Sequence, residues 1–175
     1  MKTGICILAG GLSTRMGRDK ARMRLGRRTL CGHVKLVAES LEMEVRIIRK
    51  DLIQRCGPLG GIYTGLKTSR HISEIFLSCD MPFITRPLMR RVARAKPPTF
   101  VEYAGRIGFP FMLAVSHLEI IETEIQDGRF SLQNLAKRLK ARRLRVSGQD
   151  ARQLFNVNTP ADWREAQRRL AELPL

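Results

Sequence analysis

The chain has 175 residues, of which 43% are hydrophobic, so its length and composition suit one soluble domain over residues 1–175. No apolar run approaches the ~20 residues that span a bilayer, and the amino terminus has the pattern of a strand and not of a secretion signal, so we expect a cytoplasmic protein and no membrane partner. The net charge of +16 favours anionic partners, whereas an aromatic content of only 6% argues against specific nucleic-acid binding as the main function.

The first predicted element is a strand over residues 5–8. Its uninterrupted apolar run, Ile-Cys-Ile-Leu, is typical of a strand that is buried on both faces of a parallel sheet. Residues 9–11, Ala-Gly-Gly, come next; adjacent glycines leave main-chain N–H groups open to a phosphate, and Arg15 and Lys20 follow on the same loop. The loop lacks both the Walker spacing and Gly-x-Gly-x-x-Gly, which disfavours a P-loop NTPase and a dinucleotide dehydrogenase.

Strands and helices alternate along the rest of the chain. After a basic, loosely patterned stretch over residues 21–28, hydrophobic periodicity and capping residues predict the following elements in order: a helix over 30–41, a strand over 44–49, a helix opening at 57–62, a strand over 74–78, a helix over 85–96, strands over 99–103 and 107–115, a helix over 116–126, a helix from Ser131 that carries basic residues as far as Arg143, a short strand over 144–146, and a closing helix from Thr159 to about Leu170.

This alternation predicts an α/β fold, a three-layer α/β/α sandwich around a mostly parallel sheet. Asp51 comes almost directly after the second strand. Because Pro82 cannot continue a central strand, Asp80 is placed at the carboxyl end of the third strand. Ligands bind at that edge in open α/β sheets, so Asp80 is a candidate site residue.

The cysteines and histidines carry no motif for metal binding or nucleophilic catalysis. The four cysteines are widely spaced and include no Cys-x-x-Cys pair, so we expect structural thiols in a reducing compartment. His33, His71 and His117 are isolated, and each is interpreted as a satisfied or surface residue. The arginine-rich helices are interpreted as solvated faces, with a nucleic-acid patch as the sharper alternative.

Several separated blocks together resemble one family. They are the amino-terminal loop, Leu-Ala-Gly-Gly-x-Ser-x-Arg-Met-Gly-x-Asp-Lys at residues 8–20, and the blocks at 57–62, 79–83 and 156–160, with a weaker one at 109–114. In this order they are similar to the MobA-like nucleotidyltransferases, the molybdenum cofactor guanylyltransferases. The resemblance implies a Rossmann-like nucleotidyltransferase that transfers the GMP moiety of GTP to molybdopterin and releases pyrophosphate.

The resemblance also implies roles for particular residues. Lys20 would hold the phosphates and Asp80 would be the Mg²⁺ ligand, which agrees with the preference of Mg²⁺ for carboxylate and phosphate oxygens. Together with the glycine pair and Arg15 of the loop, the expected catalytic residues are Lys20, Arg15 and Asp80, and the expected nucleotide-binding residues are Leu8, Ala9, Gly10, Gly11, Lys20, Asp51 and Asp80. Asn156 and Asn158 are expected near the substrate.

The expected chemistry needs alignment and charge neutralisation more than proton transfer, so no His, Ser or Cys is expected to act as base or nucleophile. Three alternatives stay open: a relative that uses another base such as CTP, one with a sugar-phosphate acceptor, and a noncatalytic basic binding module. The base is open because the segment before Asp51 is shorter than is usual in the family. The positive charge also suggests an acidic partner, such as a cofactor-delivery protein or a molybdoenzyme.

Overall fold

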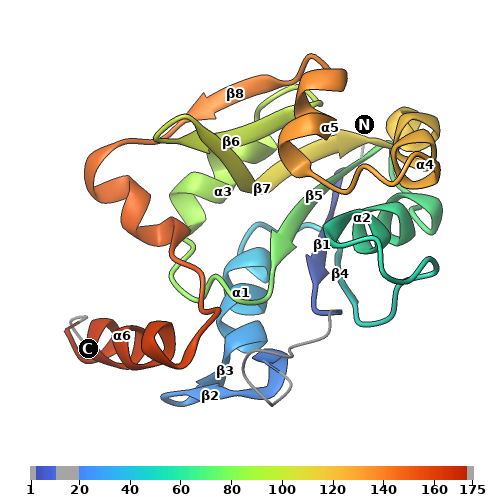
Figure 1. The fold of residues 1–175 in the computed structure, drawn as a ribbon. Coiled ribbons are helices and arrows are strands. Elements are labelled where there is room, and N and C mark those ends of the chain that lie inside the picture. The colour runs from blue at the N-terminus through green and yellow to red at the C-terminus, as the bar shows by residue number, and fades with distance from the viewer. Residues whose placement is uncertain (1–2, 11–19, 173–175) are drawn as a thin grey trace.

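A six-stranded sheet forms the centre of the computed structural model, which describes residues 3–10 and 20–172 (Figure 1). The strand order is β4-β1-β5-β7-β6-β8, and β7 runs antiparallel to both of its neighbours while the other pairs are parallel. The strands are β1 (Thr3–Leu8), β4 (Val45–Ile48), β5 (Ser73–Ser78), β6 (Thr99–Tyr103), β7 (Arg106–Ala114) and β8 (Arg142–Arg145).

Helices cover both faces of this sheet, which confirms the predicted three-layer sandwich (Figure 1). One face packs against α1 (Leu30–Glu39) and α3 (Arg86–Ala93). The other packs against α2 (Pro58–Lys67), α4 (Leu118–Gln126) and α5 (Leu132–Arg138). Short 3-10 helices span Lys20–Arg22, Val115–His117 and Gly148–Leu154, and α6 (Pro160–Ala171) closes the described chain.

The two cores follow from the alternation of side chains along each strand. Ile5 and Ile7 of β1 lie in the core beneath α1 and α3, whereas Cys6 and Leu8 lie in the core beneath α2. A strand places successive side chains on opposite faces, so an uninterrupted apolar run fills both layers at once. This is the arrangement that the run at residues 5–8 predicts.

A correction concerns the basic stretch near residue 140. Arg142 and Arg143 were expected on the exposed side of a helix, but α5 ends at Arg138 and both arginines belong to β8, which pairs in parallel with β6. Lys140 adopts a left-handed conformation, with φ of 48°, and this conformation cannot continue a right-handed helix. The periodic basic residues therefore extended the predicted helix past its true end.

A second difference lies in the stretch that showed no clear pattern. Strands β2 (Arg24–Leu25) and β3 (Arg28–Thr29) form a small hairpin. The hairpin packs against α6 through a third core cluster. Gly26 turns the hairpin with φ of 62°, and a Cβ there would lie 2.7 Å from the Leu170 side chain. The hairpin is too short to produce a periodic signal.

The cysteines and histidines occupy structural positions. Cys6, Cys31 and Cys56 are buried, Cys79 is half-buried, and all four are free thiols, as predicted. The ring of His33 bonds the Leu25 carbonyl at 2.8 Å, and Nδ1 of His117 accepts from the Ala114 N–H at 3.1 Å. Along the described ranges, no helix is long and apolar enough to cross a bilayer.

A buried ionic network joins β4, β5 and α2. The Glu74 carboxylate is fully buried; Arg46 Nη2 donates to its Oε1 at 2.7 Å, and Ser69 Oγ donates to the same oxygen at 2.6 Å. Arg46 Nη2 also donates to the Gly65 carbonyl at 2.8 Å. Burial and the neighbouring Glu74 raise the pKa of the Cys6 thiol, which keeps it protonated. Sequence reasoning missed this network, although a Glu inside an apolar strand was its signal.

We predict that Arg46→Met destabilises the protein by about 3 to 5 kcal/mol, because it leaves the buried Glu74 carboxylate without its arginine and with the His71 ring, 3.3 Å from Oε1, as a remaining ionisable neighbour. Urea unfolding followed by circular dichroism measures the change in the free energy of unfolding. Lys35→Met is the matched control, since Lys35 pairs with Glu39 where both side chains are about half exposed, and it should cost less than about 1 kcal/mol. Equal losses in the two variants would contradict the role given to the network.

Candidate functional site

Three parallel strands end together at one edge of the sheet. Leu8 at the end of β1 is in register with Ile48 of β4 and Ser78 of β5. Beyond the strands, the Ala9 N–H donates to the Ile48 carbonyl at 2.8 Å, and the Cys79 N–H donates to the Leu8 carbonyl at 3.1 Å. The three loops that carry the predicted site residues therefore leave the sheet side by side, and Asp80 lies at the edge where the sequence predicts it.

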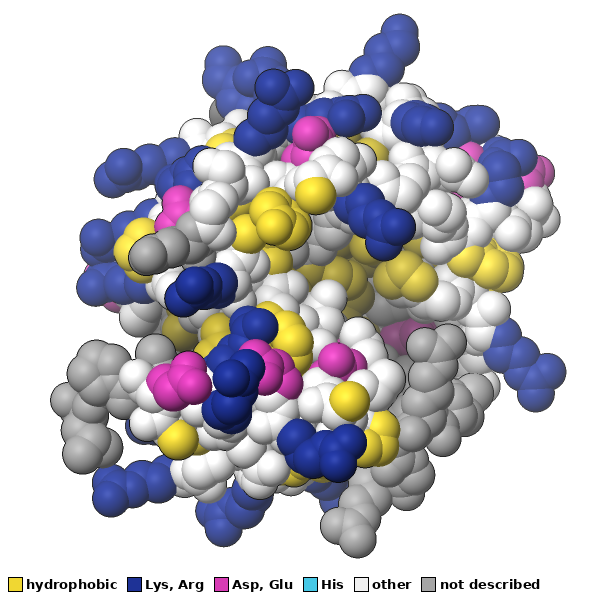
Figure 2. All heavy atoms as spheres, turned by 60° about the vertical axis from the view of Figure 1, so that its left-hand side comes forward, with side chains coloured by type: hydrophobic (Ala, Val, Ile, Leu, Met, Phe, Trp, Pro, Cys, Tyr) yellow, Lys and Arg dark blue, Asp and Glu magenta, His cyan; other side chains and the backbone are white. Residues whose placement is uncertain are grey.

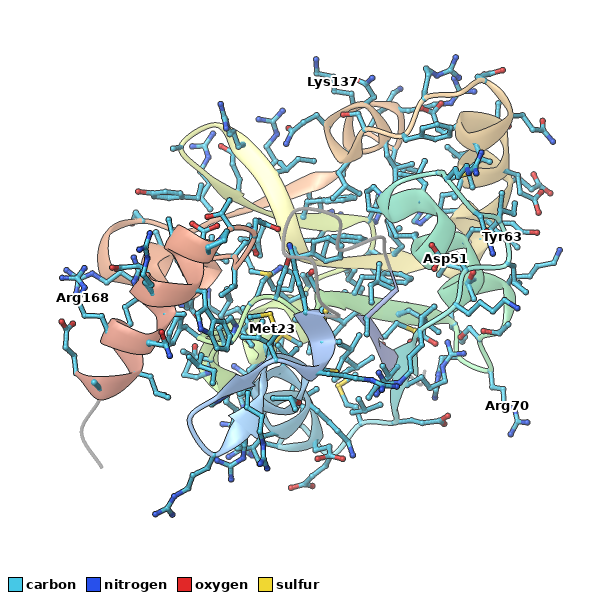
Figure 3. All side chains as sticks on the ribbon, turned by 60° about the horizontal axis from the view of Figure 1, so that its bottom comes forward. Met23, Asp51, Tyr63, Arg70, Lys137 and Arg168 are labelled. Atoms are coloured by element: carbon cyan, nitrogen blue, oxygen red, sulfur yellow. The ribbon has the colours of Figure 1, made fainter. Side chains whose placement is uncertain are left out.

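Asp51 lies beside α2 (Figure 3), where it closely approaches glycine backbone. A Cβ added at Gly10 would lie 3.2 Å from Asp51 Oδ1, and one added at Gly60 would lie 2.9 Å from Oδ2. A Cβ at Gly61 would lie 3.1 Å from Leu8. These glycines therefore allow a close approach that a side chain would prevent. Partial burial raises the pKa of the Asp51 carboxyl.

Asp80 is held at the other side of the β1 loop. The Ser78 hydroxyl donates to Asp80 Oδ1 at 2.6 Å, which fixes the carboxylate at the end of β5. Burial raises the pKa of Asp80, and the Ser78 hydrogen bond and the charge of Lys20 oppose that rise without cancelling it. Asp80 is therefore a negative charge in a poorly solvated place, with a cationic side chain near it.

Lys20 connects the beginning of the chain to the segment that leads into α6. Its Nζ donates to Asn158 Oδ1 at 2.8 Å, across 138 residues of sequence. The neighbouring Val157 N–H donates to the Asp80 carbonyl at 2.9 Å. Lys20, Asp80 and Asn158 are thus brought into one group by two hydrogen bonds, one from a side chain and one from the backbone.

The start of α6 fixes the position of Asn158. Asp162 Oδ2 accepts the N–H groups of Asn158 at 2.9 Å and of Thr159 at 2.8 Å, while the Thr159 hydroxyl accepts from the Asp162 N–H at 3.1 Å. This is the capping arrangement that the sequence around Thr159 predicts. Burial acts to raise the pKa of Asp162, but these N–H donors, the Thr159 hydroxyl and Lys20 outweigh it, so the pKa lies below its usual value.

Of the other predicted site residues, the two asparagines are described by the structure, and Gly11 and Arg15 are not. Asn156 is exposed, whereas Asn158 is the asparagine that contacts Lys20. Gly11 and Arg15 lie outside the described residues. Sequence reasoning did not find Ser78 as the partner of Asp80. The only signal was that Ser78, the last residue of β5, stands two positions before the acid.

The residues present fit a divalent cation held mainly by its substrate. In the part of the chain that the structure describes, no group of three or more His, Cys, Asp and Glu side chains could enclose a metal ion. Mg²⁺ is commonly held by one or two carboxylates together with phosphate oxygens and water. Asp80 is a single fixed carboxylate with a raised pKa, and a bound cation would lower that pKa, so the residue suits that kind of site.

Comparison with known proteins places this geometry in a family context. The family profile described as MobA-like NTP transferase domain matches residues 5–145. The molybdenum cofactor guanylyltransferase of Pseudomonas paraeruginosa is 30% identical over 179 aligned residues, covering 89% of this chain and 90% of that protein. The probable molybdenum cofactor guanylyltransferase of Carboxydothermus hydrogenoformans is 27% identical, covering 91% of this chain and 92% of that protein.

Solved structures share the fold. The molybdopterin-guanine dinucleotide biosynthesis protein A of Archaeoglobus fulgidus superposes with a TM-score of 0.76 at 20% identity, covering 97% of this chain and all of that one. The 2-C-methyl-D-erythritol 4-phosphate cytidylyltransferase of Thermus thermophilus superposes with a TM-score of 0.70 at 17% identity, covering 99% of this chain and all of that one. At these identities the likeness concerns the fold alone.

We predict that Asp80→Asn raises the melting temperature at neutral pH in the absence of nucleotide and divalent cation. The folded-state pKa of Asp80 is raised, so folding favours its protonated form, and stability falls as pH rises from the ordinary Asp value of about 3.9 through the raised value. The gain in Asp80→Asn should therefore disappear below about pH 3.9.

Differential scanning fluorimetry over a pH series measures this effect. Asp150→Asn is the control, because Asp150 is exposed and its replacement should change the stability by less than about 0.5 kcal/mol. A lower melting temperature for Asp80→Asn at neutral pH would contradict the desolvated state inferred for the carboxylate.

Proposed function

The chain belongs to the MobA-like NTP transferase family, and from that premise we propose that it transfers the guanylyl group of GTP to molybdopterin and releases pyrophosphate. The family profile covers most of the chain, and the relatives that match along nearly their whole length are named molybdenum cofactor guanylyltransferases. The proposed product is molybdopterin guanine dinucleotide.

One observation carries the proposal: Lys20, Asp80 and Asn158 meet at the carboxyl edge of β1 and β5. A lysine and a carboxylate together are suited to a triphosphate and its divalent cation, since one neutralises phosphate charge and the other binds the metal. The hydrogen bond that the Lys20 ammonium donates to Asn158 Oδ1 gives the ammonium a fixed position near Asp80. Arg15 and the N–H groups of Gly10 and Gly11 belong to the same proposal as further phosphate ligands.

In the proposed reaction a molybdopterin phosphate oxygen attacks the α-phosphorus of GTP. A new phosphorus–oxygen bond forms, and the bond from the α-phosphorus to the oxygen that bridges to the β-phosphorus breaks, with its electron pair leaving on pyrophosphate. Both the attacking and the leaving groups are anionic, so no protein group has to move a proton. The task of the protein is to align the groups and to neutralise their charges.

The positions of the histidines support this division of labour. His71 and His117 lie next to the start of β5 and the end of β7, at the edge opposite to Asp80. His33 lies on α1 and bonds the β2 backbone. Among the described residues, Lys20 is the cation that we assign to the phosphates. Mg²⁺ held by Asp80 would neutralise further charge on the phosphate oxygens.

Asp51 bears on where the nucleoside binds. Beside the β1 loop, Asp51 packs closely against the backbone of Gly10 and Gly60, which carry no side chains. We assign the nucleoside to this side of the loop. Only two residues separate β4 from Asp51, so the connection is short. The alternative is the use of CTP or of a sugar-phosphate acceptor, since a cytidylyltransferase has the same fold.

We predict that a panel of GTP, CTP, ATP and UTP, each supplied with molybdopterin and Mg²⁺, gives the fastest pyrophosphate release with GTP. Release is followed by a coupled phosphate assay, and the dinucleotide product by mass spectrometry. Asp80→Ala provides the inactive background. Faster turnover with CTP would replace guanylyl by cytidylyl transfer, and release equal to that of Asp80→Ala with every nucleotide would favour the noncatalytic binding module.

We further predict that Lys20→Ala lowers kcat about 10²- to 10³-fold, the range typical of losing one electrostatic donor to a transition state. Lys35→Ala is the matched control, since Lys35 is an exposed lysine of α1 paired with Glu39, and its kcat should stay near that of the unmodified protein. A loss of less than about tenfold in Lys20→Ala would contradict the role of Lys20 at the phosphates.

A further inference from the structure

The edge strand β8 has an outer row of backbone groups far from the proposed active site, in which the Arg145 carbonyl accepts from Arg91 Nη2 at 3.1 Å. It is the last strand of the sheet, separated from β5 by β7 and β6. The Arg142 N–H donates to the Pro98 carbonyl and the Val146 N–H donates to the Glu102 carbonyl, both at 2.9 Å. In a parallel pair, alternate residues bond to the same neighbour, so the N–H groups of Arg143 and Arg145 point away from β6.

The cations around this edge include two that are paired with Glu102 and three that pair with no described acid. Arg143 Nη1 lies 3.0 Å and Arg145 Nε lies 3.7 Å from the two oxygens of Glu102. In contrast, Lys137, Lys140 and Arg142 make no ion pair with any acidic side chain of the described residues, and all three are exposed. Figure 3 shows Lys137 pointing away from the protein, and Figure 2 shows Lys and Arg side chains around the upper part of the molecule.

These three cations surround a pocket of about 340 Å³ between α5 and β8. Its walls include the apolar side chains of Ile107, Ala136 and Ala141, and no acidic residue lines it. The pocket thus combines apolar wall groups with cations and with the polar side chain of Gln133. Such a combination suits a ligand that presents acidic groups and an apolar side chain together, because charge alone would need no apolar wall.

We propose that the β8 edge and the adjoining pocket form a docking surface for an extended acidic segment of another protein. The segment adds to the sheet beside β8, with its backbone carbonyls facing the N–H groups of Arg143 and Arg145. Its acidic side chains meet Lys137, Lys140 and Arg142, and an apolar side chain enters the pocket. The surface lies beyond the strands that carry Lys20 and Asp80, so docking leaves the active site open.

The charges on this edge also exclude the simplest competitor, a second copy of the same strand. Natural edge strands are often protected by lysine and arginine, which repel an identical edge. Here the same charges attract an oppositely charged strand. A nucleic acid is the other anionic candidate, but no exposed aromatic ring lines the pocket on which a base could stack, since Phe100 is fully buried.

The test uses a fluorescently labelled peptide in which glutamate alternates with valine, titrated with the whole protein and followed by anisotropy. The docking variant combines Lys137→Glu, Lys140→Glu and Arg142→Glu. Its matched control combines Arg86→Glu, Arg90→Glu and Arg94→Glu, which changes the net charge equally on exposed arginines of the α3 segment. Circular dichroism and melting temperature check that both variants are folded.

We predict that the docking variant weakens peptide binding at least about tenfold, as expected for losing three exposed charge pairs of ~0.5 kcal/mol each. The control should change it by less than about threefold, and added salt should weaken binding to the unmodified protein. A second peptide with proline in place of valine cannot use its backbone normally in a strand and should also bind at least about tenfold more weakly.

Equal losses in both variants would reduce the effect to general charge attraction and overturn the proposal. Equal binding of the proline peptide would overturn strand addition. A single-stranded oligonucleotide of the same charge is the final arm: tighter binding than the peptide, lost in the docking variant alone, would make nucleic acid the occupant instead. Absence of any peptide binding would also overturn the proposal. None of these outcomes depends on transferase activity.

Discussion

The in-register ending of β4, β1 and β5 is the constraint on which the candidate site depends. Backbone bonds past the ends of the strands, from Ala9 to Ile48 and from Cys79 to Leu8, keep the three exits together. Gly10, Asp51 and Asp80 each follow the end of one of these strands by two or three residues, so the sheet brings the loops that carry them to one edge. Pairing of β1 with β4 on one side and with β5 on the other holds all three strands in one register up to their last residues.

The two ends of the sheet handle charge differently. At the end where β5 begins, Glu74 is buried, but Arg46 and Ser69 satisfy its carboxylate. At the other end, Asp80 is desolvated while its pKa stays raised, so its charge is only partly compensated by the protein. The first arrangement stabilises the fold, whereas the second leaves an interaction to be completed by a ligand. This is the usual relation between a structural and a functional carboxylate.

Local sequence patterns predicted most of the fold, and they failed where the deciding contacts are not local. The apolar run at residues 5–8 and the capping residues around Thr159 have short-range causes, and both predictions are confirmed. The end of α5 was misplaced because Arg142 and Arg143 fit a solvated helix as well as an edge strand, and only pairing with β6 distinguishes the two. The contact of Lys20 with Asn158 spans most of the chain, and the family blocks indicated only that both residues matter.

The bond between Lys20 and Asn158 also has a consequence for synthesis on the ribosome. A nascent chain translated as far as β8 contains the whole sheet, the β1 loop and both acids, and the matched family domain also ends there. It still lacks Asn158, and it lacks the Val157 N–H that joins the Asp80 carbonyl. Chains that stop at β8 therefore hold the parts of the site without the two residues that join them, and the segment leading into α6 must be translated before the site can assemble.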